Sequence, residues 1–143
     1  MQNYDSANID LELERIEILN AFKGLLRAMK DRSREETKMV RKAFDIALEA
    51  HKEMRRKSGE PYIYHPIAVA RICAEEMGLE PTAVACALLH DTVEDTYITL
   101  QDIEDIFGSK VRAIIDGLTK IPEVFDENTS IQAENFRKMI LTI

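Results

Sequence analysis

Apolar residues recur every three or four positions along most of this chain, which is the spacing of helices that bury one face. The first such stretch runs from Ile9 to about Met29 and the second from about Glu35 to Arg56, with a polar break at residues 32–34 between them. No stretch alternates between apolar and polar residues for long enough to predict a strand. The pattern therefore predicts an all-α domain of orthogonally packed helices.

Proline and glycine divide the rest of the chain into shorter helices. Gly59 and Pro61 end the second helix, because glycine accepts a left-handed conformation and proline lacks the N–H that a helix needs. A proline in the first turn favours the start of a helix, as at Pro66 and Pro81. Further helices are predicted from His65 to Met77, from Pro81 to about Asp95, from the N-cap Thr99 to Phe107, from Ser109 to Leu118 and from about Ser130.

The fourth helix combines an apolar body with a charged end. Residues 81–89 read PTAVACALL, which predicts a helix buried on all sides. At about 100° per residue, the following His90, Asp91, Glu94 and Asp95 fall within one arc of roughly 140°. The negative end of the helix dipole disfavours each carboxylate by about 0.3–1 kcal/mol, and like-charge crowding adds about 0.2–0.5 kcal/mol per pair. This end of the helix therefore needs a nearby cation.

A metal ion bound by histidine and aspartate would supply that cation. His90 and Asp91 offer adjacent nitrogen and oxygen donors, and the remaining histidines are His51 and His65. His65 starts the third helix and can face the fourth, whereas His51 has no comparable surroundings and is interpreted as an ordinary side chain. Mixed nitrogen and oxygen donors suit Mn²⁺, Fe²⁺, Co²⁺ or Zn²⁺ better than Ca²⁺. The plainer interpretation makes His90 a helix cap and leaves the acids solvated.

Two further groups have the chemistry to act on a phosphate ester. Glu94 and Asp95, one turn past the His-Asp pair, can orient or deprotonate the water that the metal activates; alternatively, Asp95 merely begins a polar loop. The basic cluster of Arg55, Arg56 and Lys57, followed by Ser58 and Gly59, can hold phosphates and the base, arginine through a forked or stacked contact and lysine as a point charge. Basic residues near a helix end equally often pair with the helix dipole, so this segment alone does not separate the two interpretations.

Charge and composition narrow the classes of function. The net charge of −7 argues against a nucleic-acid surface, and a polyanionic ligand would need a local basic cluster or a bound cation. The chain has neither a run of about 18 apolar residues nor a basic-then-apolar leader, so we expect a cytoplasmic protein that does not contact a membrane. Cys73 and Cys86 lie in apolar helices without metal-type spacing and are expected to be reduced and buried.

Five strings of residues carry a resemblance to a known family. RKSGEPYIYHP at residues 56–66 and LLHDTVEDT at residues 88–96 resemble the hydrolase domain of the RelA/SpoT family. TLQDIEDIFG, DGLTKI and AENFRKM extend the likeness, in the family's order, over roughly residues 40–143. The resemblance implies the helical HD-domain fold, whose members are metal-dependent phosphohydrolases. It also implies hydrolysis of the 3′-pyrophosphate of (p)ppGpp to GDP or GTP and pyrophosphate, a reaction of the stringent response.

The resemblance further implies roles for individual residues. It assigns Mn²⁺ binding to His65, His90 and Asp91, the catalytic acid–base pair to Glu94 and Asp95, and contacts with the guanine nucleotide to Arg56, Lys57 and Ser58. Relatives that only synthesise the nucleotide have lost the His-Asp pair and the acids after it. This chain keeps them, so we expect its parent protein to be competent in hydrolysis.

The chain departs from the family near its end. The family's fourth metal ligand lies in a later helix, in a string like LADRLHN that does not occur here, so we expect this ligand beyond residue 143. Residues 1–34 are interpreted as an N-terminal helical lead-in, as in relatives in which a synthetase domain follows. Residues 35–143 are interpreted as an HD hydrolase domain without its last helices. A bifunctional parent is therefore expected, with weak metal binding and slow hydrolysis by this chain alone.

Two other functions stay open at this point. Another HD phosphohydrolase would act on a different nucleotide, such as a dNTP or a cyclic nucleotide, although the RKSGEP string argues against it. A non-catalytic regulatory module would keep the fold without turnover. A panel of nucleotide substrates tests the first alternative, and absence of metal from the complete site would support the second.

Overall fold

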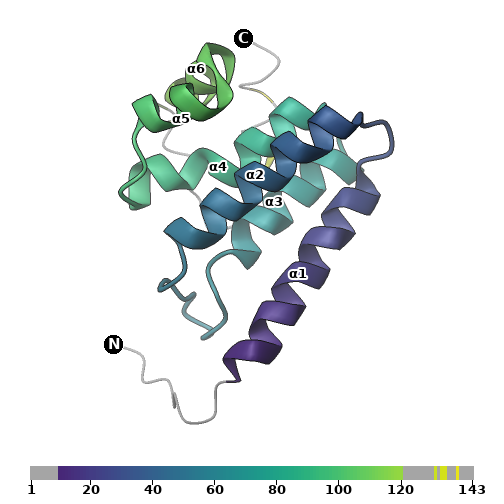
Figure 1. Cartoon of the computed structure of the whole chain (residues 1–143), viewed down its shortest axis with the longest axis vertical. Helices are drawn as coiled ribbons and strands as arrows, with labels where there is room; N and C mark the ends of the chain where they lie inside the picture. Colours follow the sequence, from purple (N-terminus) through teal and green to yellow (C-terminus); the bar gives the residue numbers. More distant parts are fainter. Residues whose placement is uncertain (1–9, 121–130, 132, 135–137, 139–143) are drawn as a thin grey trace.

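The computed structural model describes residues 10–120 and residues 131, 133, 134 and 138. The six helices of this part (Figure 1) are α1 (Leu11–Ala28), α2 (Arg34–Ala50), α3 (Tyr64–Glu75), α4 (Pro81–Asp95), α5 (Leu100–Phe107) and α6 (Ser109–Leu118). The all-α prediction is thereby confirmed for the described residues, and the helix predicted from about Ser130 lies mostly outside them. Within the same residues, no helix combines the length and hydrophobicity that crossing a bilayer requires.

Helix α4 lies at the centre of the fold. It contacts α2, α3 and α6, and these helices surround it in Figure 1. Every residue from Ala83 to Thr92 is buried, which confirms the prediction that a helix apolar on all sides is buried on all sides. Because His90 and Asp91 continue this buried helix, they are held inside the protein and not on its surface.

Helix α1 packs into the same core. The Phe22 ring stacks on that of Phe44 in α2, with 4.1 Å between the ring centroids and 11° between the ring planes, and Leu25 is fully buried. Such aromatic pairs contribute about 0.5–1.5 kcal/mol beyond the burial of their area. The segment interpreted as a lead-in therefore shares a core with the helices that follow, while the domain boundary at residue 34 stays a prediction.

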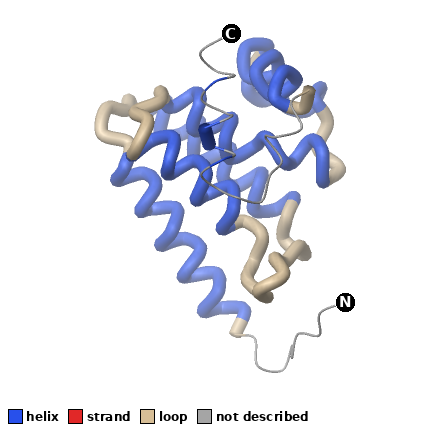
Figure 2. The backbone as a smooth tube through the Cα atoms, turned by 180° about the vertical axis from the view of Figure 1, so that it is seen from behind, coloured by secondary structure: helices blue, strands red, loops and turns tan. Residues whose placement is uncertain are grey.

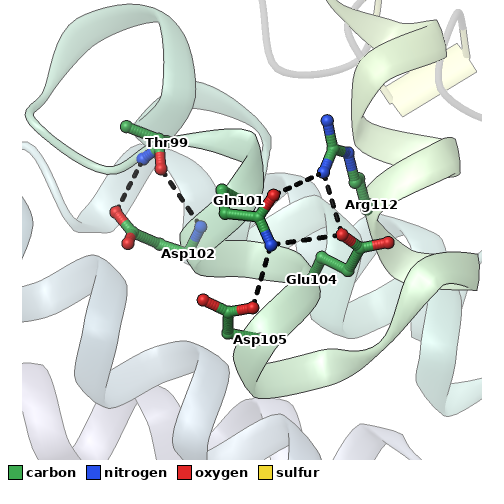
Figure 3. A network of polar contacts seen from close by, with 6 residues as sticks. All are labelled: Thr99, Gln101, Asp102, Glu104, Asp105 and Arg112. Carbon is green, nitrogen blue, oxygen red and sulfur yellow. Dashed lines mark hydrogen bonds and ion pairs between the residues drawn. The ribbon is translucent and has the colours of Figure 1, made fainter.

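Helices α5 and α6 follow α4 and are joined to each other by side-chain hydrogen bonds. As predicted, Thr99 caps α5: its hydroxyl accepts a hydrogen bond from the Asp102 N–H at 3.1 Å, and the Asp102 carboxylate accepts one from the Thr99 N–H at 3.0 Å (Figure 3). Arg112 of α6 donates to Glu104 of α5 at 2.9 Å. Gly108 joins the two helices at φ +97°, a conformation that favours glycine.

Helix α2 ends earlier than predicted. The apolar periodicity extended it to about Arg56, but the helix ends at Ala50, with His51 as its C-cap. The His51 side chain is only 2% exposed, and its ring centroid lies 4.7 Å from that of Tyr62. The apolar periodicity did not predict where α2 ends, because the residue buried at that end, His51, is polar and is not counted among the apolar positions.

Residues 54–62, called the basic hairpin from here on, form a tight turn between α2 and α3. An isolated antiparallel bridge joins Arg55 to Pro61, and Gly59 adopts φ +95°. Figure 2 shows this connection as a loop that folds back on itself between the two helices. The basic residues thus stand on a turn and not on the last turn of a helix, so pairing with the helix dipole does not explain them.

Cys73 in α3 and Cys86 in α4 are both buried and free, as expected from the sequence. Burial raises the pKa of each thiol to about 12. Because the thiolate is the reactive form, both side chains should behave as small apolar groups in the folded protein.

We predict that neither cysteine of the folded protein reacts with the thiol reagent DTNB at mildly alkaline pH. Both should react promptly once guanidinium unfolds the chain, because unfolding removes the burial that suppresses the thiolate. The absorbance of the released thionitrobenzoate measures the extent of reaction. Rapid modification of either thiol before unfolding would contradict the prediction.

Candidate active site

A cleft of about 830 Å³ opens where the basic hairpin faces the end of α4. Of the eight site residues predicted from the sequence, the cleft is lined by Arg56, Lys57, Ser58, His65, Asp91, Glu94 and Asp95. The eighth, His90, is fully buried and contacts Asp91. Three separate segments of the chain, namely the hairpin, the start of α3 and the end of α4, therefore meet at one place.

The ring of His90 lies between a backbone carbonyl and the Asp91 carboxylate. Nδ1 lies 2.8 Å from the carbonyl oxygen of Ala87, and Nε2 lies 3.1 Å from Oδ1 of Asp91. Because a carbonyl can only accept, Nδ1 carries a hydrogen. A neutral ring then presents its Nε2 lone pair beside the carboxylate, whereas a protonated ring forms an ion pair with it. In the neutral state, the two side chains offer nitrogen and oxygen donors to one cation.

Asp91 is held from its other side by Tyr62. The Tyr62 hydroxyl donates to Oδ2 of Asp91 at 2.8 Å, and the carboxylate is only 2% exposed. Burial raises the pKa of the Tyr62 phenol, and the negative charge of Asp91 raises it further, so the hydroxyl keeps its hydrogen. Hydrogen bonds of this kind fix the orientation of a carboxylate that ligates a metal.

Tyr62 and His51 were not identified as site residues from the sequence. The Tyr62 ring lies 5.8 Å from that of His65, measured between centroids, and also packs on His51. Burial lowers the pKa of His51, which favours its neutral form, and its Nδ1 lies 3.2 Å from the sulfur of Met54. The one available signal was that Tyr62 precedes His65 by three residues, the spacing of one turn. No such signal pointed to His51, which we interpreted as an ordinary side chain.

Glu94 and Asp95 stand at the open end of the site. Both are exposed, and both line the cleft. Desolvation raises the pKa of Asp95, and the nearby charges of Asp91 and Glu94 raise it further. A carboxylate whose pKa is raised binds a proton more readily, which suits it to accept one from an attacking water.

The opposite wall of the cleft is basic. The Arg56 N–H donates to the Glu60 carbonyl at 2.9 Å, and the Gly59 N–H donates to the Arg56 carbonyl at 2.8 Å, so hydrogen bonds within the hairpin hold its tip. The Arg56 guanidinium also pairs with the Glu60 carboxylate at 3.3 Å while remaining 32% exposed. Cations of the hairpin thus line the same cleft as the carboxylates of α4 and the imidazole of His65.

The donors present fit a divalent cation as a partial coordination set. Within the residues that the structure describes, no group of three or more His, Cys, Asp or Glu side chains is arranged to hold a metal ion. However, His65, His90 and Asp91 are all buried, and burying a carboxylate is costly unless a positive partner offsets it. Imidazole nitrogen with carboxylate oxygen is a donor set for Mn²⁺, Fe²⁺, Co²⁺ or Zn²⁺.

The chain is similar to several known proteins. The HD domain family matches residues 43–143. The bifunctional (p)ppGpp synthase/hydrolase SpoT of Escherichia coli (strain K12) is 46% identical over 110 residues, which cover 76% of this chain and 16% of that protein. The guanosine-3′,5′-bis(diphosphate) 3′-pyrophosphohydrolase of Vibrio cholerae serotype O1 is 46% identical over 105 residues, which cover 73% and 15%. The chain therefore spans only a small part of the length of these curated relatives.

A solved structure resembles the fold as well. It is described as a metazoan ortholog of SpoT that hydrolyzes ppGpp and plays a role in starvation responses. Its TM-score is 0.55 at 28% identity, over 62% of this chain and 49% of that one. This likeness confirms the helical HD-domain fold expected from the sequence, and the matched relatives confirm the resemblance to RelA/SpoT proteins. Because the family match covers well over half of the residues, the chain belongs to the HD domain family.

Proposed function

We propose that this chain is a metal-dependent hydrolase domain that removes the 3′-pyrophosphate of (p)ppGpp. The observation that supports the proposal is the cleft, in which a basic hairpin faces buried imidazole and carboxylate groups. The names of the matched relatives and the description of the solved structure mention the same nucleotide. The synthase/hydrolase name of the Escherichia coli relative supports a bifunctional parent. We place the activity in the cytoplasm.

The basic hairpin is the part of the proposed site that binds the nucleotide. The substrate is a polyanion, whereas the chain carries a net charge of −7, so the local field must be reversed where the phosphates bind. Arg56 offers a forked contact or a planar surface for the guanine base, and Lys57 offers a point charge. The Ser58 hydroxyl adds a hydrogen bond to the phosphates or the ribose.

His65, His90 and Asp91 would hold the metal, which we propose to be Mn²⁺ and for which further ligands are needed. When bound, the cation supplies polarisation of a phosphoryl oxygen and a lowered pKa for a coordinated water. The chain's own contribution is to orient these donors. Ala87 fixes the His90 ring through Nδ1, and Tyr62 fixes Asp91 through Oδ2.

Glu94 and Asp95 would accept the proton of the attacking water. The water oxygen forms a bond to the phosphorus attached to the ribose 3′ oxygen, and the bond between that phosphorus and the 3′ oxygen breaks. The carboxylates orient the water and accept its proton, and the 3′ oxygen of the product takes up a proton. The products are pyrophosphate and GDP or GTP, so the atoms balance without a further reactant.

We predict that Mn²⁺-dependent release of pyrophosphate from ppGpp will require His90. The purified chain should be tested first, followed by a chimera in which it replaces the matched segment of the Escherichia coli SpoT relative. His90→Ala and Asp91→Asn should both abolish release, because the first removes a proposed metal donor and the second removes the negative charge of another. The exposed Lys38→Ala should leave release unchanged.

The controls decide between the remaining functions. Circular dichroism and metal analysis establish that each protein is folded and metal-loaded. A folded, metal-loaded chimera that releases no pyrophosphate would refute the hydrolase function and leave a non-catalytic HD module. Preferential cleavage of another nucleotide in a substrate panel would identify a different HD phosphohydrolase.

We predict that Tyr62→Phe weakens Mn²⁺ binding by roughly 10–100-fold, the usual effect of losing a hydrogen bond to a metal ligand. The ring that packs on His51 remains, so the fold should be kept. The dissociation constant can be measured from free Mn²⁺ by electron paramagnetic resonance. Tyr64→Phe, which removes a neighbouring hydroxyl, is the matched control. Equal Mn²⁺ affinities of the wild-type and Tyr62→Phe proteins would rule out this orienting role.

We predict that Asp95→Asn lowers hydrolysis by at least roughly 100-fold, because it removes a proposed proton acceptor. The same change should stabilise the metal-free protein by up to about 0.5 kcal/mol after solvent screening, because it relieves repulsion from Asp91 and Glu94. Urea unfolding at neutral pH measures the free energy of unfolding. Asp31→Asn controls for the loss of one negative charge. A destabilised Asp95→Asn protein would contradict the predicted repulsion.

A further inference from the structure

A two-pronged ion pair joins helix α1 to the basic hairpin. Nη1 of Arg55 donates to one carboxylate oxygen of Glu14 and Nη2 donates to the other, each at 2.8 Å. The side chains are only 21% and 26% exposed, so the pair is partly shielded from water. Such forked pairs fix geometry as well as adding energy.

Arg55 also holds the inside of the hairpin. Its Nη1 donates to the carbonyl oxygen of Gly59 at 2.8 Å, and its backbone pairs with Pro61. One guanidinium therefore ties α1 to both arms of the turn. The hydrogen bond from Arg55 also lowers the pKa of the Glu14 carboxyl, in keeping with an ionised partner.

The two consecutive arginines of the basic hairpin make different contacts. Arg55 reaches α1 and also borders the cleft, whereas Arg56 pairs with Glu60 at the tip and lines the cleft with Lys57 and Ser58. Holding Arg55 against α1 therefore fixes the start of the arm that carries the next cationic residues.

We propose that Glu14 is a positioning residue, which acts through Arg55 to hold the basic hairpin in the conformation that binds the nucleotide. This inference rests on the proposed function, because it assigns the hairpin to the phosphates of (p)ppGpp. It gives α1 a role in substrate binding, although α1 does not line the cleft. It also explains why a partly buried carboxylate lies on the otherwise exposed start of α1.

A competing role for Glu14 predicts the opposite effect. Arg55 itself borders the cleft, so Glu14 could instead neutralise a cation that would otherwise bind a phosphate. Removing the carboxylate would then tighten nucleotide binding. If Glu14 positions the hairpin, removing the carboxylate weakens binding.

The experiment compares the full chain carrying Glu14→Gln, Arg55→Lys and the exchanged pair Glu14→Arg with Arg55→Glu. Binding of ppGpp and of Mn²⁺ is measured separately by isothermal titration calorimetry. Glu14→Gln should weaken ppGpp binding roughly tenfold, the loss expected for hydrogen bonds between charged groups, and leave Mn²⁺ binding unchanged. Glu12→Gln, which removes an exposed charge from the same turn, should change neither.

Three results of these titrations decide whether Glu14 positions the hairpin. Weaker ppGpp binding by Glu14→Gln, with partial recovery in the exchanged pair, supports the positioning role, because recovery requires the pair and not either charge alone. Unchanged or tighter ppGpp binding overturns it. Equal weakening of Mn²⁺ binding also overturns it, because that result indicates a general loss of structure.

Hydrogen exchange separates this inference from the proposed function. The amides of Arg56 and Gly59 donate within the hairpin, so they should exchange faster in Glu14→Gln than in the wild type without any ligand. Failure of the wild type to bind ppGpp with Mn²⁺ present would count against the proposed function alone. Unchanged exchange at these two amides would overturn the positioning role whatever the nucleotide is.

Discussion

The burial of an imidazole and a carboxylate at the end of an apolar helix is the constraint on which this site depends. His90 is fully buried and Asp91 almost fully buried, because α2, α3 and α6 pack against α4. Removing a carboxylate from water costs several kcal/mol, on the order of what a small domain has in reserve, unless hydrogen bonds and a positive charge replace the lost solvation. The hydrogen bond from Tyr62 to Asp91 supplies part of that replacement, and a divalent cation would complete it.

At the acids that follow His90 and Asp91, the charge repulsion that lowers the stability of the fold also favours proton transfer. The neighbouring charges of Asp91 and Glu94 make the ionised form of Asp95 less favourable, yet the same repulsion makes that carboxylate a better base. Strain of this electrostatic kind persists where the surrounding structure is rigid enough to bear it. The central position of α4 provides that rigidity, since its body packs on three other helices.

Most of the fold and much of the site could be predicted from the sequence, because both follow from local patterns. All-round apolarity predicted the burial of α4, and the Thr99–Asp102 spacing predicted the cap of α5. The end of α2 could not be predicted from periodicity, since it depends on the burial of His51 against a tyrosine eleven positions away. The contact of Glu14 with Arg55 joins residues 41 positions apart, and no local pattern encodes it.

The stacking of Phe22 on Phe44 shows that the family match and the hydrophobic core do not begin at the same residue. The match to the HD domain family begins at residue 43, but the hydrophobic core extends back through α1. A protein that began at residue 43 would expose the ring of Phe44 that packs on Phe22, and it would lose Glu14, the partner of Arg55. The family match is thus shorter than the hydrophobic core, and a protein trimmed to that match would lack a helix that packs into this core.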